Sequence, residues 1–259
     1  MGGGLEEIGK TIRSRLEGTE FSDHVRGELW DSTWMGGFRV RVAALLGLRP
    51  GDRVLDVGCG DGWFALQNAL AYPEVEFVGV DLFEAEEAER IAELLGVGNC
   101  RFYRMDALEM DFREEFDHVV LFMALGNICE TLSDLERLFE NCRKALRGGG
   151  KLLVVEPFEE DFPAEVREAV KKLYRLYRDL RKPRGEDRET VLSRGEALAA
   201  LEKTGFKILV LGGKEFDWYV TRDEAKEYFG LDELPPDVPD RIWVHGKPKR
   251  VTIILALRD

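Results

Sequence analysis

The chain has 259 residues, of which 44% are hydrophobic and 10% aromatic, so it can bury a substantial core as one large or two small domains. This excludes a disordered chain, a collagen-like repeat and a small disulfide-stapled fold. Lys and Arg number 37 against 50 Asp and Glu, a formal net charge of −13. That charge argues against a uniformly basic nucleic-acid binder unless charge is segregated along the chain.

The sequence favours a soluble cytoplasmic protein without a metal. Its four cysteines are scattered and predict no disulfide framework. The three histidines are too dispersed for a metal site (His24, His118 and His245). The start has no basic region followed by an apolar run, and no apolar run is long enough to span a membrane, so we expect neither export nor a membrane span. The 34% of charged residues and the single Gln are typical of a thermophilic protein.

The first 49 residues precede the turn Pro50-Gly51-Asp52 and are interpreted as an N-terminal cap. Trp34 and Phe38 lie there among arginines, and we expect Trp34 to contact the substrate.

From Arg53 onward, short runs rich in β-branched residues alternate with stretches of helical periodicity. Strands are expected at 54–58, 75–81, 100–106, 118–125 and 151–158, and helices at 63–71, 84–95 and 131–146. Two further strands are expected at 206–211 and 250–257. This alternation is typical of an α/β protein with a parallel sheet and helices on both faces.

Two segments are additional to the strands and helices of a minimal α/β sheet, and we interpret both as insertions at sheet ends. They are 159–192, an inserted helical cap, and 213–249, an insertion before the last strand. Between them, Ser193 and Glu196 predict a capping box that opens a helix. We interpret residues 1–259 as a single domain with these additions.

A strand runs directly into a glycine turn at Val54 to Gly62. Glycines there let the backbone approach a ligand and free the amides at a helix start for an anionic group. Asp81 ends the next strand, 19 residues past Gly62, where a carboxylate can accept both hydroxyls of a ribose. From these residues alone, a nicotinamide dinucleotide and S-adenosylmethionine both remain possible ligands.

The loop has the pattern G-x-G-x-G with an acidic residue two positions before its first glycine. Residues 53–62 thus resemble motif I of the class I S-adenosylmethionine-dependent methyltransferases, and the resemblance extends over about 40–158 and 193–258. It implies an enzyme with a seven-stranded, mostly parallel, doubly wound sheet, an antiparallel last hairpin and S-adenosylmethionine as cofactor.

Residue by residue, the resemblance implies that Asp56 holds the cofactor's amino group and that Asp81 binds the ribose hydroxyls. The backbone at Gly58, Cys59 and Gly60 would wrap the methionine moiety.

The resemblance also implies an adenine site. Leu82 would pack on the base, Asp106 would accept from its amine and the Ala107 amide would face the ring. Phe122 and Met123 would close the other side.

Acceptor residues are expected at the carboxyl ends of the fourth and fifth strands, because that edge of an open α/β sheet faces the crevice. Asn127 and Glu156 are the candidate catalytic residues there. Pro157 and Phe158 would offer an aromatic surface to a flat ring. The alternative is that Glu156 pairs with an arginine and Phe158 belongs to the core.

A helix is expected between Pro163 and Pro183, with one apolar stripe (Val170, Leu173, Tyr174, Tyr177 and Leu180). Off that stripe, residues 171–184 carry seven bases against the single acid Asp179 (Lys171, Lys172, Arg175, Arg178, Arg181, Lys182 and Arg184). Arg175 and Arg178 are therefore candidates for binding phosphate, and Lys247, Lys249 and Arg250 would extend this face. The alternative is a solvated face neutralised by nearby acids.

This basic face leads us to expect methylation of a nucleobase exocyclic amine in structured RNA, such as rRNA or tRNA. The alternative is a small-molecule N- or O-methyltransferase with its acceptor enclosed under the cap, which the net charge of −13 favours. A third possibility is a cofactor-binding subunit without its own catalysis.

Overall fold

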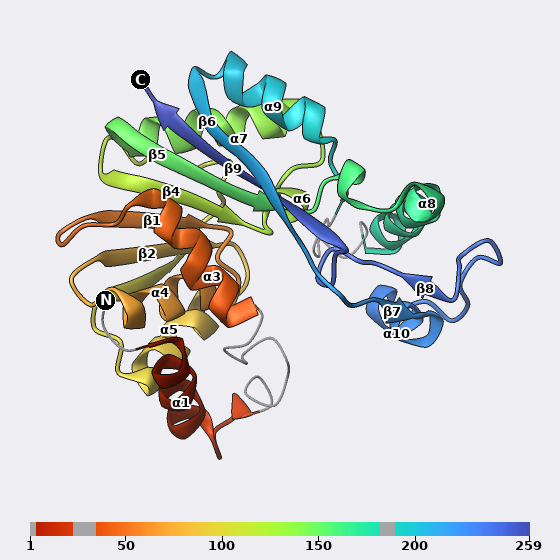
Figure 1. The fold of residues 1–259 in the computed structure, drawn as a ribbon, viewed down its shortest axis with the longest axis horizontal. Coiled ribbons are helices and arrows are strands. Elements are labelled where there is room, and N and C mark those ends of the chain that lie inside the picture. The colour runs from red at the N-terminus through yellow and green to blue at the C-terminus, as the bar shows by residue number, and fades with distance from the viewer. Residues whose placement is uncertain (1–3, 23–34, 182–189) are drawn as a thin grey trace.

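A computed structural model describes residues 4–22, 35–181 and 190–259. Its centre is a seven-stranded sheet in the order β3-β2-β1-β4-β5-β9-β6 (Figure 1). The strands are β1 (Arg53–Val57), β2 (Glu76–Asp81), β3 (Cys100–Arg104), β4 (Phe116–Phe122), β5 (Leu146–Glu156), β6 (Phe206–Glu215) and β9 (Arg250–Arg258). β1 to β5 pair in parallel, while β9 is antiparallel to both β5 and β6. The predicted α/β fold, with its mostly parallel sheet and antiparallel last hairpin, is confirmed.

Helices cover both faces of the sheet because successive strand residues point to opposite sides. In β1, Val54 packs on one face and Leu55 and Val57 on the other. The first face carries α1 (Leu5–Leu16), α3 (Met35–Ala43), α4 (Trp63–Ala71) and α5 (Ala85–Leu95). The second carries α7 (Leu132–Ala145) and α9 (Arg194–Lys203). The short helices are η2 (Ala44–Leu46), α6 (Leu125–Ile128) and η3 (Glu159–Asp161).

The N-terminal segment packs into the core of the first face. Ile8, Ile12 and Leu16 of α1 are buried with Phe38 and Val42 of α3. α1 contacts α3, α4 and α5. This packing brings α3 beside the glycine loop.

Helix α9 begins at Arg194 as predicted, but the predicted capping box is absent. Ser193 makes no side-chain cap, and its hydroxyl instead donates to Glu160 at 3.2 Å. The Arg194 N–H also donates to Glu160, at 2.8 Å. The prediction was wrong because Glu160, a carboxylate brought close by the fold, binds the Ser193 hydroxyl and caps the Arg194 N–H.

The two insertions pack against each other in a lobe beyond the ends of β6 and β9 (Figure 1). The lobe contains α8 (Ala164–Arg181), α10 (Arg222–Phe229) and a two-stranded sheet of β7 (Val220–Thr221) and β8 (Arg241–Ile242). Phe229 of α10 contacts the rings of Tyr174 and Tyr177 on α8, at centroid distances of 5.0 and 5.7 Å. The predicted start of the inserted helix after Pro163 is confirmed. The second insertion begins later than expected, since β6 continues to Glu215.

Candidate active site

The carboxyl ends of β1, β2 and β4 open onto a cavity of about 920 Å³. The glycine loop forms one side of it and α3 contributes Met35 and Arg39. The lobe contributes the remaining wall (Tyr177, Tyr228, His245 and Gly246). Residues from the sheet edge and from both insertions therefore meet around one space.

The glycine loop has the backbone that its sequence predicts. Gly58 has φ +68° and Gly60 has φ +53°, a region that residues with a Cβ rarely adopt. A Cβ on Gly58 would lie 2.8 Å from the Cβ of Ala124 and 2.9 Å from Cδ1 of Ile128. Any side chain there would disturb the wall, so the loop presents backbone to the cavity.

Asp56 lies on the cavity floor, almost fully buried, and its Oδ2 has no hydrogen-bond partner among the described residues. Burial raises the pKa of Asp56 to about 7, against the lowering effects of the Ala65 N–H and the charge of Arg39. Burial also lowers the pKa of Arg39 to about 10, so its guanidinium stays cationic at neutral pH. The site thus holds a buried carboxylate with an unused oxygen beside a buried cation.

Asp81 accepts three backbone N–H bonds at the second strand end. Gly60 donates to Oδ2 at 3.0 Å, while Phe83 and Glu84 donate to Oδ1 at 2.8 and 3.0 Å. These bonds fix the carboxylate at the cavity wall. Next to it, the Leu82 side chain also lines the cavity and is 40% exposed.

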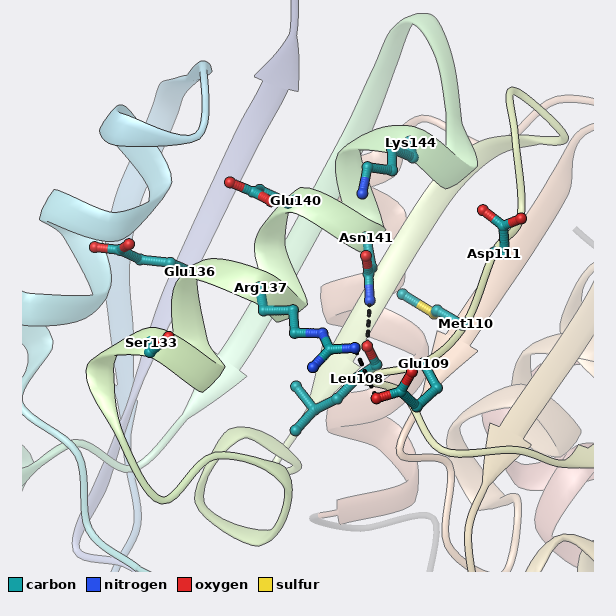
Figure 2. A pocket seen from close by; sticks show the side chains of 10 residues that line it. All are labelled: Leu108, Glu109, Met110, Asp111, Ser133, Glu136, Arg137, Glu140, Asn141 and Lys144. Atoms are coloured by element: carbon teal, nitrogen blue, oxygen red, sulfur yellow. Dashed lines mark hydrogen bonds and ion pairs between the residues drawn. The ribbon is translucent and has the colours of Figure 1, made fainter.

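Asp106 and Ala107 line the cavity after β3. Asp106 Oδ1 accepts from the Leu108 N–H at 2.8 Å. The segment is anchored to α7, since the Asn141 amide donates to the carbonyls of Leu108 at 2.9 Å and Ala107 at 3.3 Å (Figure 2).

A second hollow, of about 500 Å³, lies between this segment and α7. Figure 2 shows the side chains that line it. Its walls are mainly charged, and Arg137 pairs with Glu109 across it at 2.6 Å. This ion pair joins the segment after Asp106 to α7.

Phe122 lines the cavity, but on the side covered by α3 and α4. Its ring centroid is 5.4 Å from that of Phe64 and 6.0 Å from that of Phe38. β1 and β2 lie between β4 and β3 in the sheet, and Phe122 and Asp106 both line the cavity. The role expected of Phe122 at the adenine stays a prediction. The next residue, Met123, lines the cavity with a left-handed backbone at φ +54°, an unusual conformation for a non-glycine residue.

Cys59 lines the cavity as a packing residue. Burial, reinforced by the charges of Asp56 and Asp81, raises the pKa of its thiol well above the ordinary value. A neutral thiol of this kind is a poor nucleophile.

Glu156 stands at the end of β5 and is 1% exposed. Its oxygens accept from the Leu125 and Gly126 N–H groups, each at 3.2 Å. Oε1 also lies 2.8 Å from Nε2 of His245. His245 lines the cavity and Glu156 is not among the lining residues, so Glu156 stands behind the imidazole and does not itself face an acceptor. Among the described residues, it pairs with no arginine.

His245 occupies a tight turn, which the bridge between Val244 and Lys247 closes. Its backbone N–H donates to the Tyr174 hydroxyl of α8 at 2.5 Å. From the sequence, we considered His245 only as a metal ligand. Its place at the cavity wall, in contact with Glu156, was missed. The His-Gly pair between Val244 and Lys247 is a turn signal, but nothing local to it indicates Glu156 as its partner.

The remaining predicted residues have different positions. Asn127 of α6 is exposed and lines the cavity. Pro157 and Phe158 are buried outside the cavity lining, and Phe158 packs in the core with 0% exposure, so its predicted contact with a substrate ring was wrong. Trp34 lies outside the described residues.

The predicted basic face is partly neutralised. Lys171 pairs with Glu159 at 3.1 Å and Lys172 with Asp237 at 2.9 Å. Arg175 is exposed, whereas the side chain of Arg178 lies outside the described part of the chain.

The predicted extension of this face is not continuous. Lys247 lies 3.9 Å from Glu224. Arg250 points to the fully buried carboxylate of Asp161, which also accepts from Thr252 at 2.6 Å. Arg250 is therefore part of the join between β9 and η3.

Within the described ranges, no group of three or more His, Cys, Asp or Glu residues could hold a metal ion. No helix in the same ranges is both long and apolar enough to cross a membrane.

A sheet of this strand order, with a glycine loop and two strand-end carboxylates around a cavity at its carboxyl edge, defines a class I S-adenosylmethionine-dependent methyltransferase. The chain belongs to the methyltransferase-domain family, whose model matches residues 48–217.

The chain is 28% identical over 142 residues to a demethylmenaquinone methyltransferase of Staphylococcus aureus. That match covers 54% of this chain and 55% of that protein, so the chain spans about half the length of this relative.

Two solved structures share the fold. The YcgJ protein from Bacillus subtilis has a TM-score of 0.62 at 21% identity, over 86% of this chain and 97% of that chain. A geranyl diphosphate methyltransferase solved with GPP and sinefungin has a TM-score of 0.60 at 16% identity, over 98% and 99% of the two chains.

Proposed function

We propose that the chain transfers a methyl group from S-adenosylmethionine to a small-molecule acceptor held between the sheet edge and the lobe. The observation that carries this proposal is the cavity of about 920 Å³ whose far wall is Tyr177, Tyr228 and His245 of the lobe. Its volume is in the range of sites that enclose small ligands. The relatives named as demethylmenaquinone methyltransferases support a small acceptor.

The cofactor would lie along the strand ends. The unused Oδ2 of buried Asp56 suits the amino group of the methionine moiety, and the buried cation of Arg39 suits its carboxylate. Gly58 and Gly60 would let the backbone approach it closely. When bound, S-adenosylmethionine supplies an electrophilic methyl group on a sulfonium sulfur.

The adenosine end would extend towards β2 and β3. Asp81 would accept from the ribose hydroxyls, and the half-exposed Leu82 would pack on the adenine. Asp106 and the backbone of Ala107 would contact the base edge, held in place by Asn141.

The RNA hypothesis has weaker support. Two of the bases expected to bind phosphate, Lys171 and Lys172, are engaged by carboxylates, and the net charge of −13 repels RNA. Within the described part of this face, exposed Arg175 still favours it.

Calorimetry with S-adenosylmethionine tests the cofactor site. Asp81→Ala removes a charged acceptor worth roughly 1.5–3 kcal/mol, so the affinity should fall by about one to two decades. Asp111→Ala, at an exposed carboxylate paired with Arg113, is the matched control and should bind as the wild type does.

Incubation with methyl-labelled S-adenosylmethionine tests the acceptor class. The enzyme is given the small-molecule fraction and, separately, the RNA fraction of one cell extract. Label in the small-molecule fraction supports the proposal. Label in RNA alone overturns it in favour of RNA methylation, and label in neither indicates a subunit without catalysis.

A further inference from the structure

The cavity wall contains a histidine backed by a buried carboxylate. The His245 side chain is 5% exposed and that of Glu156 is 2% exposed, with Nε2 and Oε1 2.8 Å apart. One partner comes from the end of β5, next to the start of α6, and the other from the turn at 244–247 in the lobe. A base at a cavity wall with a third group orienting it is the arrangement that activates a weak nucleophile.

The contacts of Glu156 determine which nitrogen of His245 carries the proton. Each Glu156 oxygen already accepts from a backbone N–H, of Leu125 or Gly126. A carboxylate only accepts, so Nε2 of His245 must donate to it. In the neutral ring, Nδ1 is then the nitrogen able to take up a proton.

The backbone of His245 is held as firmly as its ring. The 244–247 bridge closes the turn, and the His245 N–H donates to the hydroxyl of Tyr174. The imidazole therefore has a fixed place relative to α8 as well as to β5, which a proton-transferring group requires.

We propose that His245 is the base that removes the proton of a hydroxyl-bearing acceptor and that Glu156 is its positioning residue. This inference rests on the proposed small-molecule methyl transfer. The acceptor oxygen forms the new bond to the methyl carbon, and the carbon–sulfur bond breaks with its electron pair staying on sulfur. The hydroxyl proton goes to Nδ1 of His245 and from there to solvent.

A hydroxyl acceptor follows from the presence of this base. A neutral amine attacks with its own lone pair and can lose its proton afterwards, whereas a hydroxyl is a weak nucleophile until a base takes its proton. Tyr177 and Tyr228 line the same space and suit a flat, phenol-like or enol-like acceptor.

Histidine NMR tests the positioning without any acceptor. In the whole chain labelled with ¹⁵N-histidine, His245, assigned by its loss in His245→Gln, should be neutral with its proton on Nε2. Glu156→Gln should move it towards the Nδ1–H form, because the glutamine NH₂ can donate to Nε2. His118, whose Nε2 lies 3.3 Å from Asp52 outside the cavity lining, is the internal control. The proposal is overturned if wild-type His245 carries its proton on Nδ1. It is also overturned if the tautomer of His245 is the same in the wild type and in Glu156→Gln.

Kinetics tests the base with the acceptor found in the labelled extract. His245→Gln and Glu156→Gln should each lower kcat by about 100-fold or more, with KM and S-adenosylmethionine affinity within about twofold. His118→Gln should leave kcat unchanged. The labelled product should be a methyl ether.

A wild-type kcat in His245→Gln, or a methyl group on nitrogen or carbon, contradicts the proposal. Loss of cofactor binding, or no labelled small molecule at all, counts against the proposed function instead. In that case the tautomer measurement still decides the role of Glu156.

Discussion

Glu156 and His245 are 89 positions apart in the chain, and their side chains meet at 2.8 Å. The contact joins the end of a central strand to the lobe formed by the two insertions. Both residues are buried, so the contact is shielded from water. In such surroundings a charged hydrogen bond is stronger than at the surface. The lobe therefore covers the cavity and also brings a titratable ring to it.

Asp56 should make cofactor affinity depend on pH. Its pKa of about 7 lies above the ordinary value of 3.8, so between these pH values the folded protein binds more protons than the unfolded chain and Asp56 lowers stability as pH rises. The ammonium group of S-adenosylmethionine, bound beside Asp56, would favour the ionised carboxylate. Binding of the cofactor below pH 7 must therefore release a proton. Affinity should then fall on acidification from pH 7 to 5, by up to about tenfold per pH unit.

Calorimetry across this range, in buffers of different ionisation enthalpy, measures both the affinity and the released proton. Asp56→Asn should bind S-adenosylmethionine more weakly, and its affinity should no longer show the pH dependence that Asp56 causes. A wild-type affinity that is flat from pH 5 to 7 would show that Asp56 does not meet the ammonium group.

Gly126 should not tolerate a side chain. A Cβ there would collide with the carbonyl oxygen of Thr190, while the Gly126 carbonyl accepts from the Thr190 N–H at 2.9 Å. Gly126→Ala should cost roughly 1–3 kcal/mol in the free energy of unfolding, measured with denaturant. Gly98→Ala is the control, since a Cβ there meets nothing within 4 Å. Equal stability of the two variants would argue against the close approach at Gly126.

Asp161 should be needed for stability and not for cofactor binding. Its side chain is fully buried and accepts from Thr252, Arg250 and the Phe158 N–H. Asp161→Ala should cost about 3 kcal/mol, because it leaves buried donors without an acceptor. Thermal unfolding measures the loss, and Asp237→Ala, at an exposed pair with Lys172, should hardly change Tm. If Asp161→Ala loses cofactor affinity at a temperature where it is folded, the prediction is contradicted.

Charge reversal on α8 should leave methyl transfer to a small acceptor intact. Arg175 is exposed and does not line the cavity, so Arg175→Glu with Arg178→Glu should keep kcat, KM and Tm close to the wild type. RNA methylation predicts a different outcome: weaker RNA binding, with the magnitude of the salt slope smaller by about one for each phosphate group that the variant no longer binds. Steady-state kinetics and RNA titrations at several salt concentrations separate the two.

The strand pattern and the glycine loop were sufficient to predict the fold and most of the cofactor wall. β1, β2 and β3 carry local runs of β-branched and aromatic residues, and each acidic residue lies within two positions of the end of its strand. Parallel strands bring their carboxyl ends to one edge of the sheet. Asp56, Asp81 and Asp106 therefore lie around one cavity, independently of the loop conformations.

The acceptor wall depends on contacts between distant segments, which local sequence does not encode. Phe158 looked like a substrate contact beside Glu156, but it packs into the core while Glu156 turns to His245. Ser193 and Glu196 fit a capping box, yet Glu160 takes the cap position because η3 lies against α9. The charge of Arg39 acts on Asp56 because α3 packs against α4, the helix that follows the glycine loop. Tertiary packing, and not residue spacing, decides such an interaction.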